Sequence, residues 1–289
     1  MTDLLQLLFA GISQGALYGL LAIGFVAVFT VSGVINLAQG EFAALAGLVA
    51  ISASASGLPL VVAVALSLLV VLAVSLTMER LTVRQVPGLT TLQSIILTLG
   101  VSTALKAVML IGWGPDAAGL APITAGTIEV AGVSIRSQEL WILGIAVALT
   151  LLIQWFYQST AVGQSLRACA DQPIAARLVG ISRSRATLLS FAIAGLVGAV
   201  VGVLASPISL SAWDSGLTLG LKAFVAATLG GLVSVRGALL GGVVLGVLES
   251  LTAGYLDSGF RDAVAFLLLI LVLGIRARGG FTVAGGARV

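Results

Sequence analysis

Histidine is absent from the 289 residues, and cysteine occurs once, as Cys169. Without histidine the chain has no His-ligated zinc or haem site and no histidine proton relay, and one cysteine excludes an internal disulfide or a cysteine cluster. The chain also lacks the GxxxxGK[ST] pattern of a phosphate-binding loop, so it is not itself an ATPase. These absences predict no metal ion, no cofactor and no enzymatic activity of its own, and nothing indicates nucleic-acid binding.

Charge is also scarce. Only 9% of the residues are charged while 59% are hydrophobic, whereas soluble domains carry about 25% charged residues. A soluble globule of this composition would have too little polar surface to cover itself. The apolar segments are continuous rather than alternating, which predicts an all-α integral membrane protein.

Nine apolar segments follow one another along the chain, which predicts eight to nine transmembrane helices. They cover residues 4–31, 37–56, 58–78, 91–113, 138–157, 186–206, 217–233, 238–256 and 262–275. Gly230, Gly231 and the stretch "SVRG" separate the seventh segment from the eighth. This break predicts a tight turn between two helices, or a helix pair that dips into the membrane.

The basic residues predict the orientation, because Lys and Arg accumulate on the cytoplasmic side of membrane proteins. With the N-terminus outside and the C-terminus in the cytoplasm, ten arginines lie inside and two, Arg136 and Arg261, lie outside. The inner ten are Arg80, Arg84, Arg167, Arg177, Arg183, Arg185, Arg236, Arg276, Arg278 and Arg288. The whole chain, 1–289, then forms a single transmembrane domain with an external loop at 114–137, whose "TIEVAGVSI" predicts a hairpin.

A basic cytoplasmic loop at 158–185 interrupts the apolar pattern. Asp171 is a predicted helix cap, Pro173 suits a first turn and Gly180 suits the residue after a last turn. The spacing predicts a two-turn helix, "PIAARLV", whose small residues suit a groove on a partner protein. The alternative is an ordinary positive-inside loop with no partner.

Glycine makes up 36 residues and recurs at spacings of three to five, as in Gly11-Gly15-Gly19, Gly195-Gly198-Gly202 and Gly241-Gly242-Gly246. Small residues at such spacings let helix backbones approach closely. We therefore expect these segments to pack tightly against other helices.

Polar residues inside apolar segments are the candidates for a transport pathway. They are Gln14 and Tyr18 on one face of the first segment, Asn36, Gln39 and Glu41 at a membrane edge, and the ionisable Lys222 and Glu249. Each has a structural alternative: interhelical hydrogen bonding for Gln14 and Tyr18, turn and helix capping for Asn36, Gln39 and Glu41, and a mutual ion pair for Lys222 and Glu249.

Three motifs carry a resemblance to a known family. The stretches "GISQGALYGLLAIGFVAVFTVSGVINLAQGEFAALAG" (11–47), "LRACADQPIAARLVGI" (166–181) and "GLKAFVAATLGGLVSVRGALLGGVVLGVLE" (220–249) occur in this order. The chain resembles the LivH-type permeases of branched-chain amino acid ABC transporters along nearly its whole length. "IAARLVGI" resembles the cytoplasmic loop by which ABC importer permeases dock onto their ATPase.

The resemblance implies the fold of an ABC importer permease bundle in a bacterial inner membrane. The implied partners are a second related permease, two cytoplasmic ATPases and an extracytoplasmic solute-binding protein. Coupling to the ATPase would rest on the loop, with Ala175 and Ala176 facing the partner, Gly180 ending the helix, and Arg167 and Arg177 fixing its approach; Asp171 and Ile181 complete the set.

The implied solutes are branched-chain amino acids or similar small polar molecules, with urea, short amides or aromatic acids as alternatives within the family. A stand-alone secondary transporter or channel is a second reading, but it would need an acidic or histidine relay across the membrane. An intramembrane enzyme is poorly supported, because the chain has no histidine and its one cysteine lies in a loop.

Overall fold

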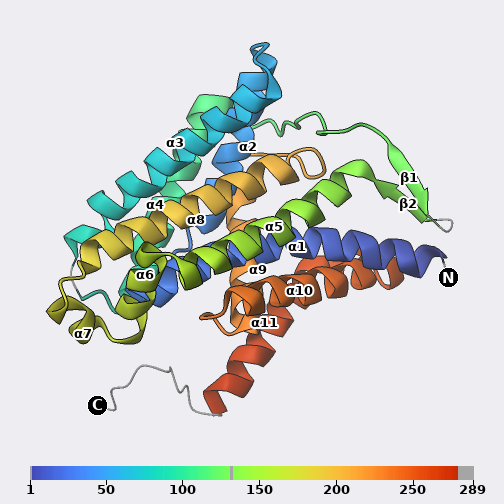
Figure 1. Cartoon of the computed structure of the whole chain (residues 1–289). Coiled ribbons are helices and arrows are strands. Elements are labelled where there is room, and N and C mark those ends of the chain that lie inside the picture. Colours follow the sequence, from blue (N-terminus) through green and yellow to red (C-terminus); the bar gives the residue numbers. More distant parts are fainter. Residues whose placement is uncertain (1, 87, 131–132, 279–289) are drawn as a thin grey trace.

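The computed structural model describes residues 2–86, 88–130 and 133–278. Arg288, one of the ten arginines predicted inside, lies outside these ranges. The fold is a bundle of helices with one small hairpin (Figure 1). The elements are α1 (Thr2–Ser32), α2 (Gln39–Ala55), α3 (Leu60–Leu81), η1 (Val83–Gln85), α4 (Thr91–Trp113), β1 (Thr127–Val130), β2 (Val133–Arg136), α5 (Ser137–Ser159), α6 (Ala161–Asp171), α7 (Pro173–Leu178), α8 (Arg183–Ala205), α9 (Ser215–Gly230), α10 (Val235–Tyr255), η2 (Ser258–Phe260) and α11 (Arg261–Arg278).

Every one of the nine predicted apolar segments coincides with one of these helices. Six described helices are long and apolar enough to cross a membrane: α1, α3, α4, α5, α8 and α10. The helices α2 and α9 are apolar but shorter, at 17 and 16 residues. The chain is therefore a multi-pass helical membrane protein.

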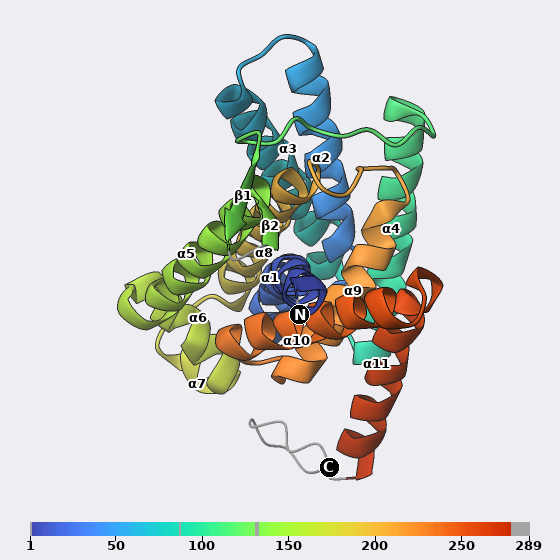
Figure 2. The ribbon, with the colours of Figure 1, turned by 90° about the vertical axis from the view of Figure 1, so that its right-hand side faces the viewer.

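Helix α1 forms the centre of the bundle. Viewed along its axis, it is surrounded by α2, α5, α8, α9 and α10 (Figure 2). Of the residues in its most apolar membrane-length stretch, 83% are buried inside the protein, whereas only 17% of those in α4 are buried. The apolar faces of α3, α4 and α5 are thus free to meet lipid or a partner, while α1 is almost entirely enclosed by protein.

The most extensive contact between two helices joins α1 to α10, and it runs through glycine, as the small-residue spacing predicted. A side chain at Gly15 would overlap Gly242 and Val243, and one at Gly246 would overlap Gly11 and Gly15. Because these residues lack a Cβ, the two backbones touch directly along several turns. The glycines of α8 act similarly, with Gly202 against Ala43 of α2.

The break after Gly230 is a tight turn between two helices. Gly231 adopts a left-handed conformation with φ of 100°, and Leu232 follows with φ of 60°. The hydroxyl of Ser234 then accepts a hydrogen bond from the Gly237 N–H at 3.1 Å and caps α10. The predicted tight turn between the two helices is therefore present.

The hairpin predicted within residues 114–137 is present. Strands β1 and β2 pair antiparallel, with Ile128 opposite Ile135. The hairpin and the N-terminal end of α1 lie at one end of the bundle, and α6 and α7 lie at the other (Figure 1). The two loops named from the sequence thus occupy opposite ends of the molecule.

Candidate functional site

The chain between α1 and α2 is buried without being helical. Val34, Ile35, Asn36, Leu37 and Ala38 are all buried. Buried backbone groups need hydrogen-bond partners, and in a membrane protein water does not supply them. A row of hydroxyls on α4 does so here.

Two hydroxyls of α4 satisfy this backbone. The Ile35 N–H donates to Ser94 Oγ at 3.3 Å and the Leu37 N–H donates to Thr98 Oγ1 at 3.1 Å. The sequence analysis missed this row, although its signal was present: Ser94, Thr98, Ser102 and Lys106 follow one another every four residues, which places them on one face of a helix.

Asn36, Gln39 and Glu41 form the polar layer at this point, each 0% exposed. Gln39 Nε2 donates to the Ala194 carbonyl at 2.9 Å. Glu41 Oε1 accepts from Ser102 Oγ at 2.9 Å and lies 4.0 Å from Lys106 Nζ. The structural alternative predicted for Asn36, stabilisation of a turn, is observed, since Asn36 Oδ1 accepts a hydrogen bond from the Ala38 N–H at 3.2 Å.

These partners do not satisfy the layer completely. Asn36 Nδ2, Gln39 Oε1 and Glu41 Oε2 are buried and have no hydrogen-bond partner. Each unpaired group costs free energy on the order of 1–3 kcal/mol. Three such atoms within six residues leave this polar layer incompletely satisfied in the arrangement that the structure shows.

A second polar cluster joins four helices. Lys222 Nζ on α9 lies 3.1 Å from Glu249 Oε1 on α10 and 2.7 Å from Asp262 Oδ1 on α11. Tyr18 on α1 donates its hydroxyl proton to Glu249 Oε2 at 2.9 Å. The predicted Lys222–Glu249 pair and Tyr18 are therefore brought together, and Asp262 is a member that the sequence analysis missed.

The two polar clusters remain separate. No hydrogen bond or ion pair between described residues connects Glu41 to Lys222. Gln14 is half-buried one turn before Tyr18 and on the same face of α1. The predicted translocation residues thus form two sites in the bundle rather than one continuous polar path.

The predicted loop helix is present as α7, with one correction at its start. Asp171 is the last residue of α6 and is exposed, and the residue before α7 is Gln172, which makes no side-chain cap. The end of α7 agrees with the prediction. Gly180 has φ of 84°, its N–H donates to the Arg177 carbonyl, and the Ile181 N–H donates to the Ala176 carbonyl, which is the Schellman pattern.

The exposed face of α7 also differs from the prediction. Ala176 is only 3% exposed and packs on Val31, Leu166, Cys169 and Ala186, so it does not face outward. Ala175 is exposed, as are Arg167 and Arg177. The outward face carries large apolar side chains instead: Ile174, Leu178 and Val179 are 78%, 84% and 75% exposed. Ile174 and Leu178 are four residues apart and therefore share one face.

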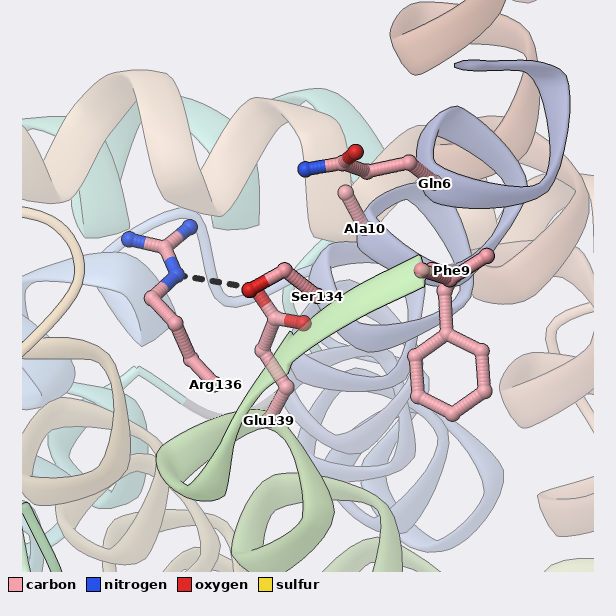
Figure 3. Close-up of a pocket in the computed structure, with 7 residues that line it drawn as sticks. Gln6, Phe9, Ala10, Ser134, Arg136 and Glu139 are labelled. Carbon is pink, nitrogen blue, oxygen red and sulfur yellow. Dashed lines mark hydrogen bonds and ion pairs between the residues drawn. The ribbon is translucent and has the colours of Figure 1, made fainter. Parts of the chain in front are cut away.

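A cavity of about 340 Å³ lies at the hairpin end of the bundle (Figure 3). It is bordered by Gln6, Phe9 and Ala10 of α1 and by side chains of β2 and the start of α5. Arg136 Nε donates to Glu139 Oε1 at 3.0 Å on one side of it. Since both charges are already paired, the cavity offers no free ionic partner to a ligand.

Taken together, membrane-length helices around an enclosed α1 define a multi-pass integral membrane protein with charged and polar groups buried inside its bundle. The family described as "Branched-chain amino acid transport system / permease component" matches residues 7–273. The chain belongs to this family.

Individual relatives agree. The chain is 32% identical over 286 residues to "High-affinity branched-chain amino acid transport system permease protein LivH" of Escherichia coli (strain K12), covering 93% of this chain and 92% of that protein. It is 31% identical over 290 residues to "High-affinity branched-chain amino acid transport system permease protein BraD" of Pseudomonas aeruginosa, covering 95% and 94% of the two chains.

A solved structure shares the fold. The structure titled "PsaBC from Streptococcus pneumoniae in complex with Fab" aligns with a TM-score of 0.51, over 91% of this chain and 90% of that chain. The sequence identity is 15%, so the likeness concerns the arrangement of helices alone.

Proposed function

We propose that this chain is the membrane-spanning permease subunit of an ATP-driven importer that moves branched-chain amino acids, or similar small polar solutes, into the cytoplasm. The observation that carries the proposal is the family match across residues 7–273, together with relatives named as branched-chain amino acid permeases over nearly their whole length. Urea, short amides and aromatic acids are the alternative solutes.

The proposed assembly contains a second related permease, two cytoplasmic ATPases and an extracytoplasmic solute-binding protein, in a bacterial inner membrane. The exposed apolar faces of α4 and α5 support a partner within the bilayer, because Ile111 and Leu151 on these helices are 86% and 60% exposed. Residues 1–289 act as one domain with nine spans and the N-terminus outside, an orientation supported by the ten-to-two distribution of arginine.

The test of the proposed function is uptake by the reconstituted assembly. Proteoliposomes that contain both permeases and both ATPases, with ATP inside and loaded binding protein outside, should accumulate labelled leucine. Competition by valine and isoleucine, but not by urea or phenylalanine, would identify the solute class. Accumulation of urea in place of leucine would support the alternative.

Coupling to the ATPases is assigned to α6 and α7. The exposed Ile174, Leu178 and Val179 form the proposed apolar docking face, with Arg167 and Arg177 beside it. Burying one leucine side chain stabilises a contact by about 1.5–3 kcal/mol, so Leu178→Ser should weaken ATPase binding about tenfold or more.

The docking face is tested by copurification of the ATPases and by solute-stimulated ATP hydrolysis. Leu210→Ser is the matched control, because Leu210 is 63% exposed in the loop between α8 and α9 at the opposite end of the bundle. Leu178→Ser should lower both measurements and Leu210→Ser should change neither. Equal behaviour of the two variants would remove α7 from the coupling surface.

For translocation, the polar layer of Asn36, Gln39 and Glu41 is the proposed gate, and Gln14 and Tyr18 line the approach to the Lys222–Glu249 pair. The three unpartnered atoms of the layer support this assignment. Opening the bundle at α2 would expose them to solute, and closing it would bury them again.

A further inference from the structure

A second cavity, of about 250 Å³, lies at the α7 end of the bundle. Its walls come from the end of α1, the end of α3 with η1 and the turn that follows, α7, and the start of α8. None of the residues in the polar clusters described above borders it. It is smaller than the roughly 300–1,000 Å³ pockets that hold drug-sized ligands, so it suits a smaller molecule.

Four of the residues that border this cavity are aliphatic: Val34, Val83, Val86 and Leu89. Val34 and Val83 are buried and belong to the same apolar cluster, against which Leu89 packs, while Val86 is 43% exposed. These four side chains match a short branched hydrocarbon.

Other residues that border the cavity carry both signs of charge. Glu79 borders the cavity, is only 1% exposed, and its Oε2 is buried without a hydrogen-bond partner. Arg84 of η1, Arg177 of α7 and Arg183 of α8 also border it and are exposed. Among the described residues none of the four forms an ion pair within 4.0 Å; Arg183 donates to the Ser32 carbonyl at 3.4 Å.

A buried carboxylate without a cationic partner is destabilising, and a ligand that brings an ammonium group offsets that cost. Arginine binds carboxylates through its planar set of N–H donors. A ligand that satisfies both ends must therefore be a zwitterion, with a cation and a carboxylate or phosphate. An acidic side chain, or a lipid whose headgroup is only anionic, would pair with the arginines but leave Glu79 unpaired. Among zwitterions, an α-amino acid also brings the short branched hydrocarbon that the aliphatic residues match.

We infer that this cavity binds a free α-amino acid with a branched aliphatic side chain, its ammonium group at Glu79, its carboxylate at the arginines and its hydrocarbon against the valines. The inference rests on the proposed function, which supplies such an amino acid as product on the side of the membrane where α7 lies. Because the cavity includes Arg177 of the proposed coupling helix, bound product holds α7 and slows further import.

Direct binding tests the site in the absence of partners. The full chain in lipid nanodiscs should bind labelled leucine, and Glu79→Gln should weaken binding about tenfold or more, since it removes the charge that pairs with the ammonium group. Arg84→Gln should also weaken it, whereas Arg185→Gln, two residues after Arg183 on α8 but outside the cavity, should not. Isovalerate and isopentylamine, which each lack one charge, should compete far more weakly than leucine.

The assembled importer tests the consequence. Leucine trapped inside proteoliposomes should slow the initial uptake of external leucine in the wild type, and Glu79→Gln should abolish this dependence. Glu129→Gln, the same change on the exposed hairpin, should keep it. Unchanged leucine binding in both the Glu79 and Arg84 variants would overturn the inference. It would also be overturned if these variants lost copurification of the ATPases but still bound leucine.

The two proposals fail separately. If the assembly imports no leucine, the proposed function fails, but leucine binding to the chain in nanodiscs still tests the cavity assignment. If the assembly imports leucine and the Glu79 and Arg84 variants bind it as the wild type does, only the cavity assignment fails.

Discussion

At the scale of single residues, Lys222 is the most constrained charge in the bundle. Its Nζ is within 3.4 Å of oxygens from Tyr18, Glu249 and Asp262, on three other helices. Desolvation of these charges opposes folding, and their mutual attraction offsets it only while every partner is present. The cluster therefore ties α1, α9, α10 and α11 together.

Replacing Lys222 with methionine should leave Glu249 as a buried, unpaired carboxylate. Removing one partner of a buried pair lowers the free energy of unfolding by about 3–5 kcal/mol. We expect a clear loss of thermal stability in detergent, measured by size-exclusion chromatography after heating. The double variant Lys222→Met with Glu249→Gln should regain part of it.

Lys106→Met is the control for this prediction. Lys106 Nζ is 4.0 Å from Glu41 Oε1 and its side chain is 19% exposed, so its removal should cost less. A Lys222 variant as stable as the Lys106 variant would show that the four-helix cluster does not stabilise the bundle.

The sequence predicted the Lys222–Glu249 pair because two opposite charges in neighbouring apolar segments need one another. It did not predict Asp262, because an acid in the first turn of a helix is ordinary. Ala176 was placed on the wrong face of α7 for a related reason: six residues of helix carry too little periodicity to reveal which side is buried.

At the scale of elements, the contact between α1 and α10 depends on the absence of side chains. Adding a Cβ at Gly15 would bring it to 2.6 Å from Val243 Cα, and the neighbouring atoms are backbone that cannot swing aside. The lipid-facing helices have glycines in open surroundings; a Cβ at Gly144 of α5 would meet nothing within 4 Å.

These two glycines should therefore respond oppositely to the same substitution. Gly15→Ala should destabilise the protein by about 1–3 kcal/mol through overpacking. Gly144→Ala should be neutral or stabilising by up to about 1 kcal/mol, because alanine has fewer backbone conformations than glycine in the unfolded chain and loses less entropy on folding. Thermal unfolding of the two variants side by side checks the difference in sign, and equal destabilisation would contradict the close backbone contact.

The helices themselves could be predicted well, since continuous apolar runs leave few alternatives to helix in a membrane. The non-helical segment from Gly33 to Ala38 is harder, because its stability depends on hydroxyls of α4 about 60 residues later. The spacing of Ser94 and Thr98 indicates a polar face, but only the packed bundle shows which backbone it serves.

At the scale of the whole molecule, the hairpin and the α7 loop mark the two faces that a membrane would separate. In a Cys169→Ser background, Thr2→Cys and Ile128→Cys should react with a membrane-impermeant maleimide added to intact cells. Arg183→Cys should react only after the membrane is permeabilised, because the arginine distribution assigns it to the cytoplasm. Labelling of Arg183→Cys in intact cells would reverse the orientation.

The enclosed position of α1 has a consequence for how the protein is made. Helix α1 is synthesised first, yet its glycine face is covered by α10, and the hydrogen bond from Tyr18 to Glu249 spans 231 positions of sequence. Contacts so distant in the chain form late. During synthesis the glycine face of α1 therefore stays exposed to lipid or to the insertion machinery until α10, in the final quarter of the chain, has been synthesised.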